Sequence, residues 1–388
     1  MSQRPIYLDA HATTPMDERV LEAMLPYFTE SFGNPSTNTH VYGWEASAAV
    51  KQARETIAET INATPEEIVF TSGATEANNL AIKGVAEAYF SQGKHIITVA
   101  TEHRAVLDPC AYLETLGFEV TYLPVQPDGL LDLEKLEKAI GEDTILVSVM
   151  AANNEIGVLQ PLAEIGEICH SHGVLFHTDA AQAIAKIPLD VAEMKIDLMS
   201  LTAHKIYGPK GIGALYVRRR DPRVKLASQI QGGGQERGRR SGTLYTPQIV
   251  GFAKALEIGA SMMEAESERL FKLKKQLWSM FEPLEGIYLN GNFTRSLQGN
   301  LNLSIEGVNG SALLLALQPV VALSSGSACS SQSTAPSHVL TALGRDEQLA
   351  HASLRFGIGR FNTPEEIETV GKTAIAAINS LRQANKLQ

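Results

Sequence analysis

The feature that most constrains the fold is a regular alternation of short apolar runs and helical patterns between Ile68 and Val217. The apolar runs are rich in Val, Ile and Leu and are bounded by polar or Gly-containing turns, which is typical of buried strands. Strands are expected over 68–70, 95–100, 118–123, 145–150, 174–177, 197–201 and 212–217, and helices over 77–90, 105–116 and 163–172. This alternation predicts an α/β fold, with a mostly parallel sheet and helices on both faces.

The rest of the chain departs from this alternation. Residues 44–61 have helical spacing, and Pro15 is expected in the first turn of an N-terminal helix that runs through Met24. One long helix is expected over 248–281, followed by shorter units that include helices at 312–317 and 365–381. We therefore expect two domains: a large domain over 15–258, and a smaller α+β domain formed by 1–14 together with 259–388.

Charge and cysteine content narrow the class of function. The 388 residues carry a formal net charge of −10, which argues against nucleic acid or an acidic membrane as a partner. The arginines between Arg218 and Arg240 are a local exception, which fits either a solvated edge or a phosphate or subunit contact. The 3 cysteines are scattered, so we expect no disulfide framework and no metal site. The sequence shows no signal pattern and no run long enough to span a membrane, so we expect a cytoplasmic protein.

Two polar groups at strand ends suggest a specific cofactor chemistry. Lys205 follows an apolar run, in the sequence Thr202-Ala-His-Lys205. An amine there is expected to be partly desolvated, which favours the neutral form that condenses with a carbonyl group. Asp179 follows the strand at 174–177 and could keep a pyridine nitrogen protonated, although it could also simply cap the next helix. Together they are the two protein groups that pyridoxal phosphate needs most.

Further polar signals follow other expected strands, where ligands bind in open parallel sheets. The turn at 71–79, Thr-Ser-Gly-Ala-Thr-Glu-Ala-Asn-Asn, could present N–H groups to a phosphate or be an ordinary helix cap. His103 could stack on a cofactor ring and exchange protons, or be structural. The stretch at 153–157 could be only a polar turn. Arg355 could bind a carboxylate through two hydrogen bonds or form a structural ion pair.

One cysteine differs from the other two in its surroundings. Cys110 and Cys169 lie within helical apolar patterns and are expected in the core. Cys329 lies in the stretch 324–334, which is dominated by small and hydroxylic residues. Such a composition predicts a mobile loop, and a cysteine in a polar loop can ionise and react.

With these residues assembled, the chain resembles the cysteine desulfurases of the class-V aminotransferase superfamily, and more narrowly the branch that serves iron–sulfur-cluster assembly. The resemblance runs from Tyr7 to about Asn379. The loop Ser-Ser-Gly-Ser-Ala-Cys at 324–329 separates this branch from relatives that carry Arg-x-Gly-His-His-Cys. The matching stretches are 12–15, 33–36, 71–79, 101–106, 153–157, 179–182, 204–211, 232–238, 240–243, 324–330 and 354–356.

The resemblance implies a fold and a cofactor site. The fold is that of type I pyridoxal-phosphate enzymes, with a mostly parallel sheet of the seven-stranded type and a smaller α+β domain. Lys205 would hold pyridoxal 5'-phosphate covalently, with His103 stacked on its ring. Asp179 would pair with the ring nitrogen and Gln182 with the ring hydroxyl oxygen. The residues that would bind the phosphate are Ala74, Thr75, Thr202, His204 and Thr243. Thr202 replaces the serine of many relatives, and Thr243 would come from the second subunit of a homodimer.

The resemblance also implies a reaction. Asn154 and Arg355 would bind L-cysteine, and Cys329 would take its sulfur as a persulfide, leaving L-alanine. The sulfur would pass to acceptor or scaffold proteins for iron–sulfur clusters and other sulfur cofactors. Many relatives continue into a tail that docks the scaffold, so docking by that route is not expected in a sequence that ends at Gln388.

Three alternative functions stay open at this point. A selenocysteine lyase or a class-V aminotransferase would keep the fold and the cofactor, although an aminotransferase needs no thiol such as that of Cys329. A sulfur carrier or assembly scaffold without enzymatic activity would need neither Lys205 nor Asp179.

Overall fold

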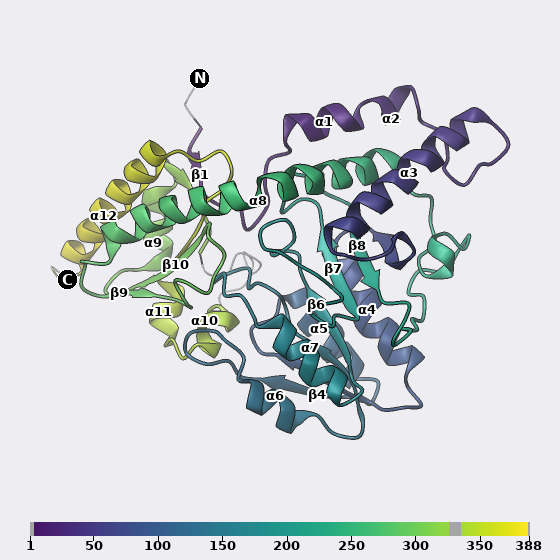
Figure 1. Ribbon diagram of the computed structural model, residues 1–388. Coiled ribbons are helices and arrows are strands. Elements are labelled where there is room, and N and C mark those ends of the chain that lie inside the picture. The colour runs from purple at the N-terminus through teal and green to yellow at the C-terminus, as the bar shows by residue number, and fades with distance from the viewer. Residues whose placement is uncertain (1–3, 326–334, 387–388) are drawn as a thin grey trace.

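A computed structural model of the chain describes residues 4–325 and 335–386, and its largest sheet has seven strands (Figure 1). The strand order is β2-β8-β7-β6-β5-β3-β4. β8 runs antiparallel to β2 and β7, and the other neighbours are parallel, which confirms the expected α/β fold. The bounds are β2 (Ile68–Thr71), β3 (His95–Val99), β4 (Glu119–Leu123), β5 (Thr144–Ser148), β6 (Leu175–Asp179), β7 (Leu198–Thr202) and β8 (Gly213–Val217).

Helices cover both faces of this sheet because alternate strand residues enter two different cores. Val69, Ile96 and Leu146 pack with residues of α4 (Ala74–Ala88) and α5 (Arg104–Glu114). Phe70, Ile97 and Val147 belong to the other core. The helices that contribute to that core are α3 (Val41–Thr60), α6 (Leu133–Ala139), α7 (Leu162–Ser171) and the first half of α8 (Thr246–Phe281).

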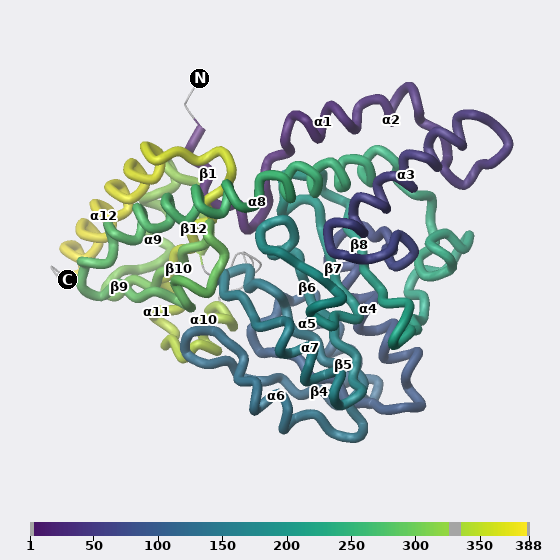
Figure 2. The backbone as a smooth tube through the Cα atoms, viewed as in Figure 1, coloured from purple at the N-terminus to yellow at the C-terminus, as the bar shows by residue number. Residues whose placement is uncertain are grey.

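The C-terminal region forms a smaller antiparallel sheet, in the order β12-β10-β9. The N-terminal strand β1 (Ile6–Tyr7) pairs with β11 (Val321–Ala322), so the first residues lie beside the last third of the chain (Figure 2). Apolar residues of these strands share one core, which includes Leu8. The remaining bounds here are β9 (Ile287–Leu289), β10 (Asn300–Ile305), β12 (Ser353–Gly357), α9 (Gly310–Leu317), α10 (His338–Ala342), α11 (Glu347–His351) and α12 (Pro364–Lys386).

The long helix α8 connects the two regions. Ile249 and Leu256 in its first half are buried against the seven-stranded sheet, whereas Leu273 and Phe281 near its end are buried in the C-terminal core. This distribution supports the expected division into 15–258 and 1–14 with 259–388, which stays a prediction.

The structure differs from expectation near the N-terminus. Helix α1 (Glu18–Met24) begins after Pro15, because Asp17 is its N-cap and accepts a hydrogen bond from the backbone N–H of Arg19 at 3.1 Å. The prediction that Pro15 lies in the first turn is therefore wrong. Helices α2 (Pro26–Thr29) and α6, and the 3-10 helices Pro65–Glu67 and Glu236–Gly238, were not expected.

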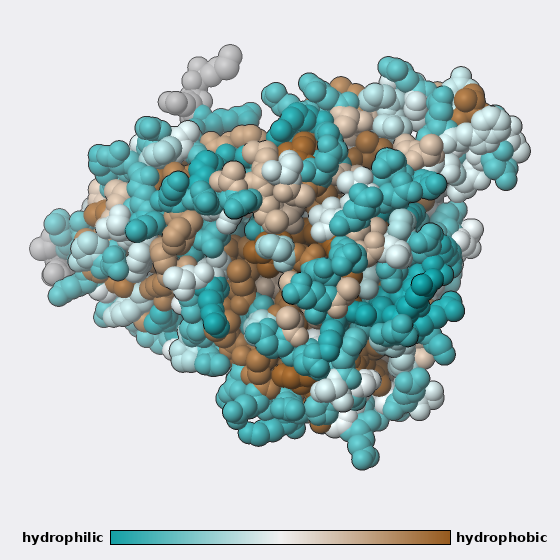
Figure 3. Space-filling view, in the orientation of Figure 1, coloured by the Kyte–Doolittle hydropathy of each residue, from teal (hydrophilic) through white to brown (hydrophobic). Residues whose placement is uncertain are grey.

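Hydrophilic residues cover most of the face shown in Figure 3, and hydrophobic residues gather along its middle, between the two regions. Over 4–325 and 335–386, no helix combines the length and the apolar character needed to cross a bilayer. Two arginines of the basic stretch form ion pairs within the fold: Arg218 with Asp197 at 3.0 Å, and Arg240 with Glu76 at 2.8 Å.

A buried arginine ties the C-terminal region to the rest of the molecule. Arg360 follows β12, and its guanidinium donates to Asp17 at 3.1 Å and to Glu266 on α8 at 3.0 Å. The guanidinium also lies 4.1 Å from the centre of the Tyr207 ring, and only 8% of the side chain is exposed. Removing it would leave the largely buried carboxylate of Glu266 without its arginine partner, which is costly, while Asp17 would keep its pair with Arg19 at 2.8 Å.

We therefore predict that Arg360→Met lowers the free energy of unfolding by about 3–5 kcal/mol. The exposed pair of Lys372 and Glu368 on α12 provides the control, since Lys372→Met should change stability by less than about 0.5 kcal/mol. Urea unfolding at one fixed protein concentration would measure both changes. Equal effects of the two substitutions would contradict the prediction.

Candidate active site

A cavity of about 510 Å³ lies at the carboxyl ends of β2, β5, β6 and β7. Except for Thr243, every candidate residue that the structure describes lines it. Thr243 is exposed and lies outside the cavity wall of this single chain. Cys329, and with it the expected mobility of its loop, lies outside the described residues. The candidates that line the cavity are Ala74, Thr75, His103, Asn154, Asp179, Gln182, Thr202, His204, Lys205 and Arg355.

Lys205 lies in the turn that follows β7, and its amine points to a segment that sequence reasoning did not assign to the site. Its Nζ donates hydrogen bonds to the carbonyl oxygens of His11 and Ala12, the latter at 2.7 Å. The pairing of β1 with β11 brings these N-terminal residues to the cavity. The one sign of these residues in the sequence is the polar run 9–14, which directly follows a short apolar stretch. This run is too far from Lys205 in the sequence for a local pattern to connect the two.

Asp179 is the last residue of β6, and its carboxylate accepts two hydrogen bonds at the cavity. Its Oδ1 accepts from the backbone N–H of Ala181 at 2.9 Å, as a turn-capping carboxylate does. Its Oδ2 accepts from Asn78 Nδ2 of α4 at 2.7 Å. The carboxylate is thus held by two donors at the cavity wall. Such a fixed carboxylate is suited to a protonated ring nitrogen.

The N-terminus of α4 offers a place for an anion. Its N-cap is Gly73, which has no side chain to cap the helix and adopts φ +150°, a conformation rare for other residues. The carboxylate of Glu76 in the first turn accepts from Ser72 N–H and pairs with Arg240. The helix end is therefore open toward Thr75, Thr202 and His204 in the cavity wall, an arrangement typical of phosphate sites.

Positive charge dominates the cavity although the protein is acidic overall. Burial, followed by the charges of Lys205 and Lys210, lowers the pKa of His204 to about 4. Burial, followed by the charges of Lys186 and Arg355, places the pKa of His11 well below its ordinary value. Both imidazoles are therefore neutral near pH 7, because they are buried and cations lie beside them. The same field favours a phosphate and a carboxylate as ligands.

Arg355 forms the structural ion pair that was one of its two possible roles. Its NH2 donates to Asp9 at 2.8 Å, its NH1 donates to the backbone oxygen of Asn154 at 2.9 Å, and 1% of the side chain is exposed. Its Nε, however, is buried without a hydrogen-bond partner among the described residues. A buried unpaired donor is costly, so a carboxylate in the cavity would gain from contact with it.

The orientation of His103 follows from its second role as the N-cap of α5. Its Nδ1 accepts a hydrogen bond from the backbone N–H of Ala105 at 3.0 Å. An accepting Nδ1 carries no proton, so Nε2 is the nitrogen that can exchange a proton. The side chain lines the same cavity as Lys205.

Comparison with known families and proteins agrees with this geometry. The model of the aminotransferase class-V family matches residues 6–370. Human cysteine desulfurase is 56% identical over 99% of this chain and 84% of that protein, and the cysteine desulfurase IscS of Rickettsia bellii is 55% identical over 99% and 93%. The chain belongs to the cysteine desulfurases of the class-V aminotransferase family.

Solved structures of similar proteins share the fold of this desulfurase. A NifS-like protein matches with a TM-score of 0.90 and 38% identity, over 97% of this chain and all of that one. The protein SspA, solved in complex with cysteine, matches with a TM-score of 0.82 and 41% identity, over 92% of this chain and all of that one.

A second carboxyl group lies beneath the cavity wall of this desulfurase. Glu155 follows Asn154, is 3% exposed, and accepts a hydrogen bond from the hydroxyl of Ser337 at the start of α10. Burial raises the pKa of Glu155 to about 7, against the opposing effects of Ser337, Arg355 and His103. The folded protein therefore keeps this proton up to about pH 7, whereas an unfolded chain loses it near 4.5.

We predict that Glu155→Gln stabilises the protein at high pH. Between pH 4.5 and 7 the folded state holds one proton more than the unfolded state, so Glu155 lowers stability progressively as the pH rises. The variant should be more stable than the parent by about 3 kcal/mol at pH 8, and the difference should fall below about 1 kcal/mol at pH 5. Urea unfolding at the two pH values would measure it. Glu164→Gln, at an exposed position on α7, should show no such pattern.

Proposed function

We propose that this protein uses pyridoxal 5'-phosphate to convert L-cysteine to L-alanine, and that Cys329 takes the sulfur as a persulfide. The observation that carries the proposal is one cavity that holds an amine at Lys205, a fixed carboxylate at Asp179 and the guanidinium of Arg355. An aminotransferase could use the same three groups, but the chain's 56% identity to a cysteine desulfurase favours desulfuration.

The residues present fit the cofactor. The uncapped start of α4, with Ala74, Thr75, Thr202 and His204, offers N–H and hydroxyl donors for its phosphate. Lys205 Nζ supplies the amine for its aldehyde, and Asp179 supplies the acceptor for its ring nitrogen. Gln182 supplies an amide donor for the ring oxygen, and His103 supplies a flat ring at the wall. Bound in this way, the cofactor draws electrons from the Cα–H and Cβ–S bonds of the substrate.

The chain's own residues then have separate tasks. Arg355 and Asn154 hold the substrate carboxylate, which places the substrate amine toward Lys205. The Lys205 amine, released when the substrate amine takes its place, removes the Cα proton. Asp179 keeps the ring nitrogen protonated, and His103 Nε2 exchanges the proton of the substrate thiol. The Cys329 thiolate attacks the substrate sulfur, so an S–S bond forms, the Cβ–S bond breaks and the electron pair stays on the carbon skeleton.

We also propose that the protein is a cytoplasmic homodimer that passes sulfur to acceptor or scaffold proteins, iron–sulfur-cluster assembly included. Support for a subunit contact comes from exposed apolar residues near Thr243. Tyr245 is 51% exposed, and its ring contacts that of Phe28, which is 45% exposed. Exposed apolar residues that gather in this way mark interaction surfaces. Thr243 would reach the phosphate of the other subunit from this surface.

The proposal predicts a covalent product that can be located. After incubation with L-cysteine, mass spectrometry should find an added sulfur on Cys329 and an equivalent of free L-alanine. Borohydride should fix pyridoxal to Lys205 alone, because no other lysine would hold it covalently. Cys329→Ala should still bind cysteine and change the cofactor absorbance, yet release less than about 1% of the sulfur, since it lacks the attacking thiolate. Full sulfur release by Cys329→Ala would contradict the proposal, and a parallel assay with selenocysteine would identify a lyase.

A shared site predicts complementation between two inactive variants. Lys205→Ala lacks the amine, and Thr243→Ala weakens the phosphate site of the opposite subunit. A mixed dimer of the two chains contains one site with both residues, so up to half of the parent activity per dimer should return. Subunit exchange would be verified with differently tagged chains. Exchange without any return of activity would contradict the shared site.

A further inference from the structure

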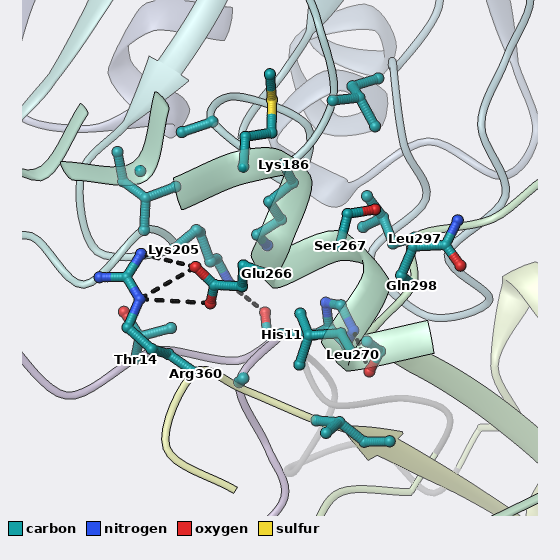
Figure 4. A pocket seen from close by; sticks show the side chains of 18 of the residues that line it. His11, Thr14, Lys186, Lys205, Glu266, Ser267, Leu270, Leu297, Gln298 and Arg360 are labelled. Atoms are coloured by element: carbon teal, nitrogen blue, oxygen red, sulfur yellow. Dashed lines mark hydrogen bonds and ion pairs between the residues drawn. The ribbon is translucent and has the colours of Figure 1, made fainter. Parts of the chain in front are cut away.

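A second, smaller cavity of about 80 Å³ adjoins the cofactor cavity, and His11 and Lys205 line both (Figure 4). Its walls come from the turn after β6, from α8 and from the segments beside β10 and β12. Lys186, Glu266 and Arg360 also line this second cavity, and Arg360 is paired with Glu266. Lys186 is not among the residues that line the larger cavity.

Lys186 contacts the cofactor cavity indirectly, through Gln182. Lys186 Nζ donates a hydrogen bond to Gln182 Oε1 at 3.1 Å. The ring nitrogen Nδ1 of His11 lies 3.2 Å from the same oxygen. Gln182 Nε2 in turn donates to the backbone oxygen of His11 at 2.8 Å. Three side chains from two distant segments thus form one closed set of hydrogen bonds.

The donor inventory of this set fixes the orientation of the Gln182 amide. The carbonyl oxygen of His11 can only accept and the protonated amine of Lys186 can only donate, so Gln182 presents its NH2 group to His11 and its oxygen to Lys186. The amide NH2 group has two N–H donors, and one of them donates to the His11 carbonyl. The other N–H is therefore still available to a ligand. Gln182 lines the larger cavity, where an inverted amide would present an acceptor in place of that donor.

We propose that Lys186 is a positioning residue, which holds the Gln182 amide so that its remaining N–H donates to the ring oxygen of pyridoxal phosphate. The inference rests on the proposed function, because it needs the cofactor in the larger cavity. Lys186 acts through another side chain, and it also adds a positive charge behind Lys205. Both effects favour the more negative form of the bound cofactor.

The surroundings of Lys186 leave it few other partners. Burial, followed by the charge of Lys205, lowers its pKa to about 7, and Glu266 opposes the change. Glu266 itself is engaged by Arg360 at 3.0 Å. Arg360 is therefore paired with a carboxylate, whereas Lys186 is hydrogen-bonded to the amide oxygen of Gln182. A buried amine kept at that cost is consistent with a positioning role.

The test compares Lys186→Met with the parent in two measurements that need no turnover. Cofactor-free protein would be titrated with pyridoxal phosphate by fluorescence, and the absorbance of the bound cofactor would be followed from pH 6 to 10. Lys186→Met should bind the cofactor about tenfold more weakly, since a charge-assisted hydrogen bond and its geometry are lost. The midpoint of the absorbance change should rise by about half a pH unit or more. Lys272→Met, at an exposed position on α8, is the control. It should have the same cofactor affinity and the same absorbance midpoint as the parent.

Combining the Lys186 and Gln182 substitutions shows whether Lys186 acts by positioning Gln182 or only through its charge. In a Gln182→Ala background, Lys186→Met should change cofactor affinity by less than twofold, because the group that it positions is absent. Lys186→Arg keeps a donor, and the adjoining cavity offers room for it, so most of the affinity should return. If Lys186→Met does not fold, Lys186→Gln replaces it in the same assays.

Two outcomes would overturn the inference. One is a folded Lys186→Met protein with parental affinity and absorbance midpoint. The other is an equal loss of affinity in the parent and in the Gln182→Ala background. Failure of the proposed function would look different, because the parent protein itself would then bind no pyridoxal phosphate.

Discussion

The site depends most on the hydrogen bonds that join residues 9–14 to the ends of β6 and β7. Thr14 donates its hydroxyl to the carbonyl oxygen of His204 at 2.9 Å, and the backbone N–H of Tyr207 donates back to that hydroxyl at 2.7 Å. Lys205 binds the carbonyls of His11 and Ala12, and Gln182 binds that of His11. The N-terminal segment therefore sets the position of the amine and of the amide that the cofactor would meet. Because β1 is part of the C-terminal region, these bonds also fix that region relative to the large sheet.

The large sheet and much of the site could be predicted from sequence because they follow from local rules. Each buried strand ends in a polar stretch, and parallel strands bring such ends to one edge. Asp179 at the end of β6 and Lys205 after β7 lie together for this reason, since β6 and β7 are parallel neighbours. The contribution of His11 could not be predicted in this way. It depends on a two-residue strand that pairs with β11, more than 300 positions later, which no periodicity encodes.

For Arg355 and Asp179, the sequence alone could not decide between a structural role and a role in binding a ligand. In both cases the structural role and the place at the cavity are present together: Arg355 pairs with Asp9, and Asp179 caps a turn. A charged side chain beside a ligand must already have a partner when the ligand is absent, because an unpaired buried charge costs several kcal/mol. The unpaired Nε of Arg355 is the part of that side chain left for a substrate. Structural and functional contacts are thus divided among the atoms of one group.

The same division explains how an acidic protein maintains a cationic cavity. Lys205 and Arg355 at the cavity wall and Lys186 behind it have fixed acceptors: backbone carbonyls for Lys205, an amide oxygen for Lys186, and a carboxylate and a backbone carbonyl for Arg355. Carbonyl oxygens satisfy the N–H donors without cancelling their charge, so the field of the cations remains available to a ligand. Burial lowers the pKa values of His11 and His204 and that field adds to the effect, so both rings stay neutral. Neutral rings leave the positive potential concentrated on the amines and the guanidinium, beside the positions that a phosphate and a carboxylate would occupy.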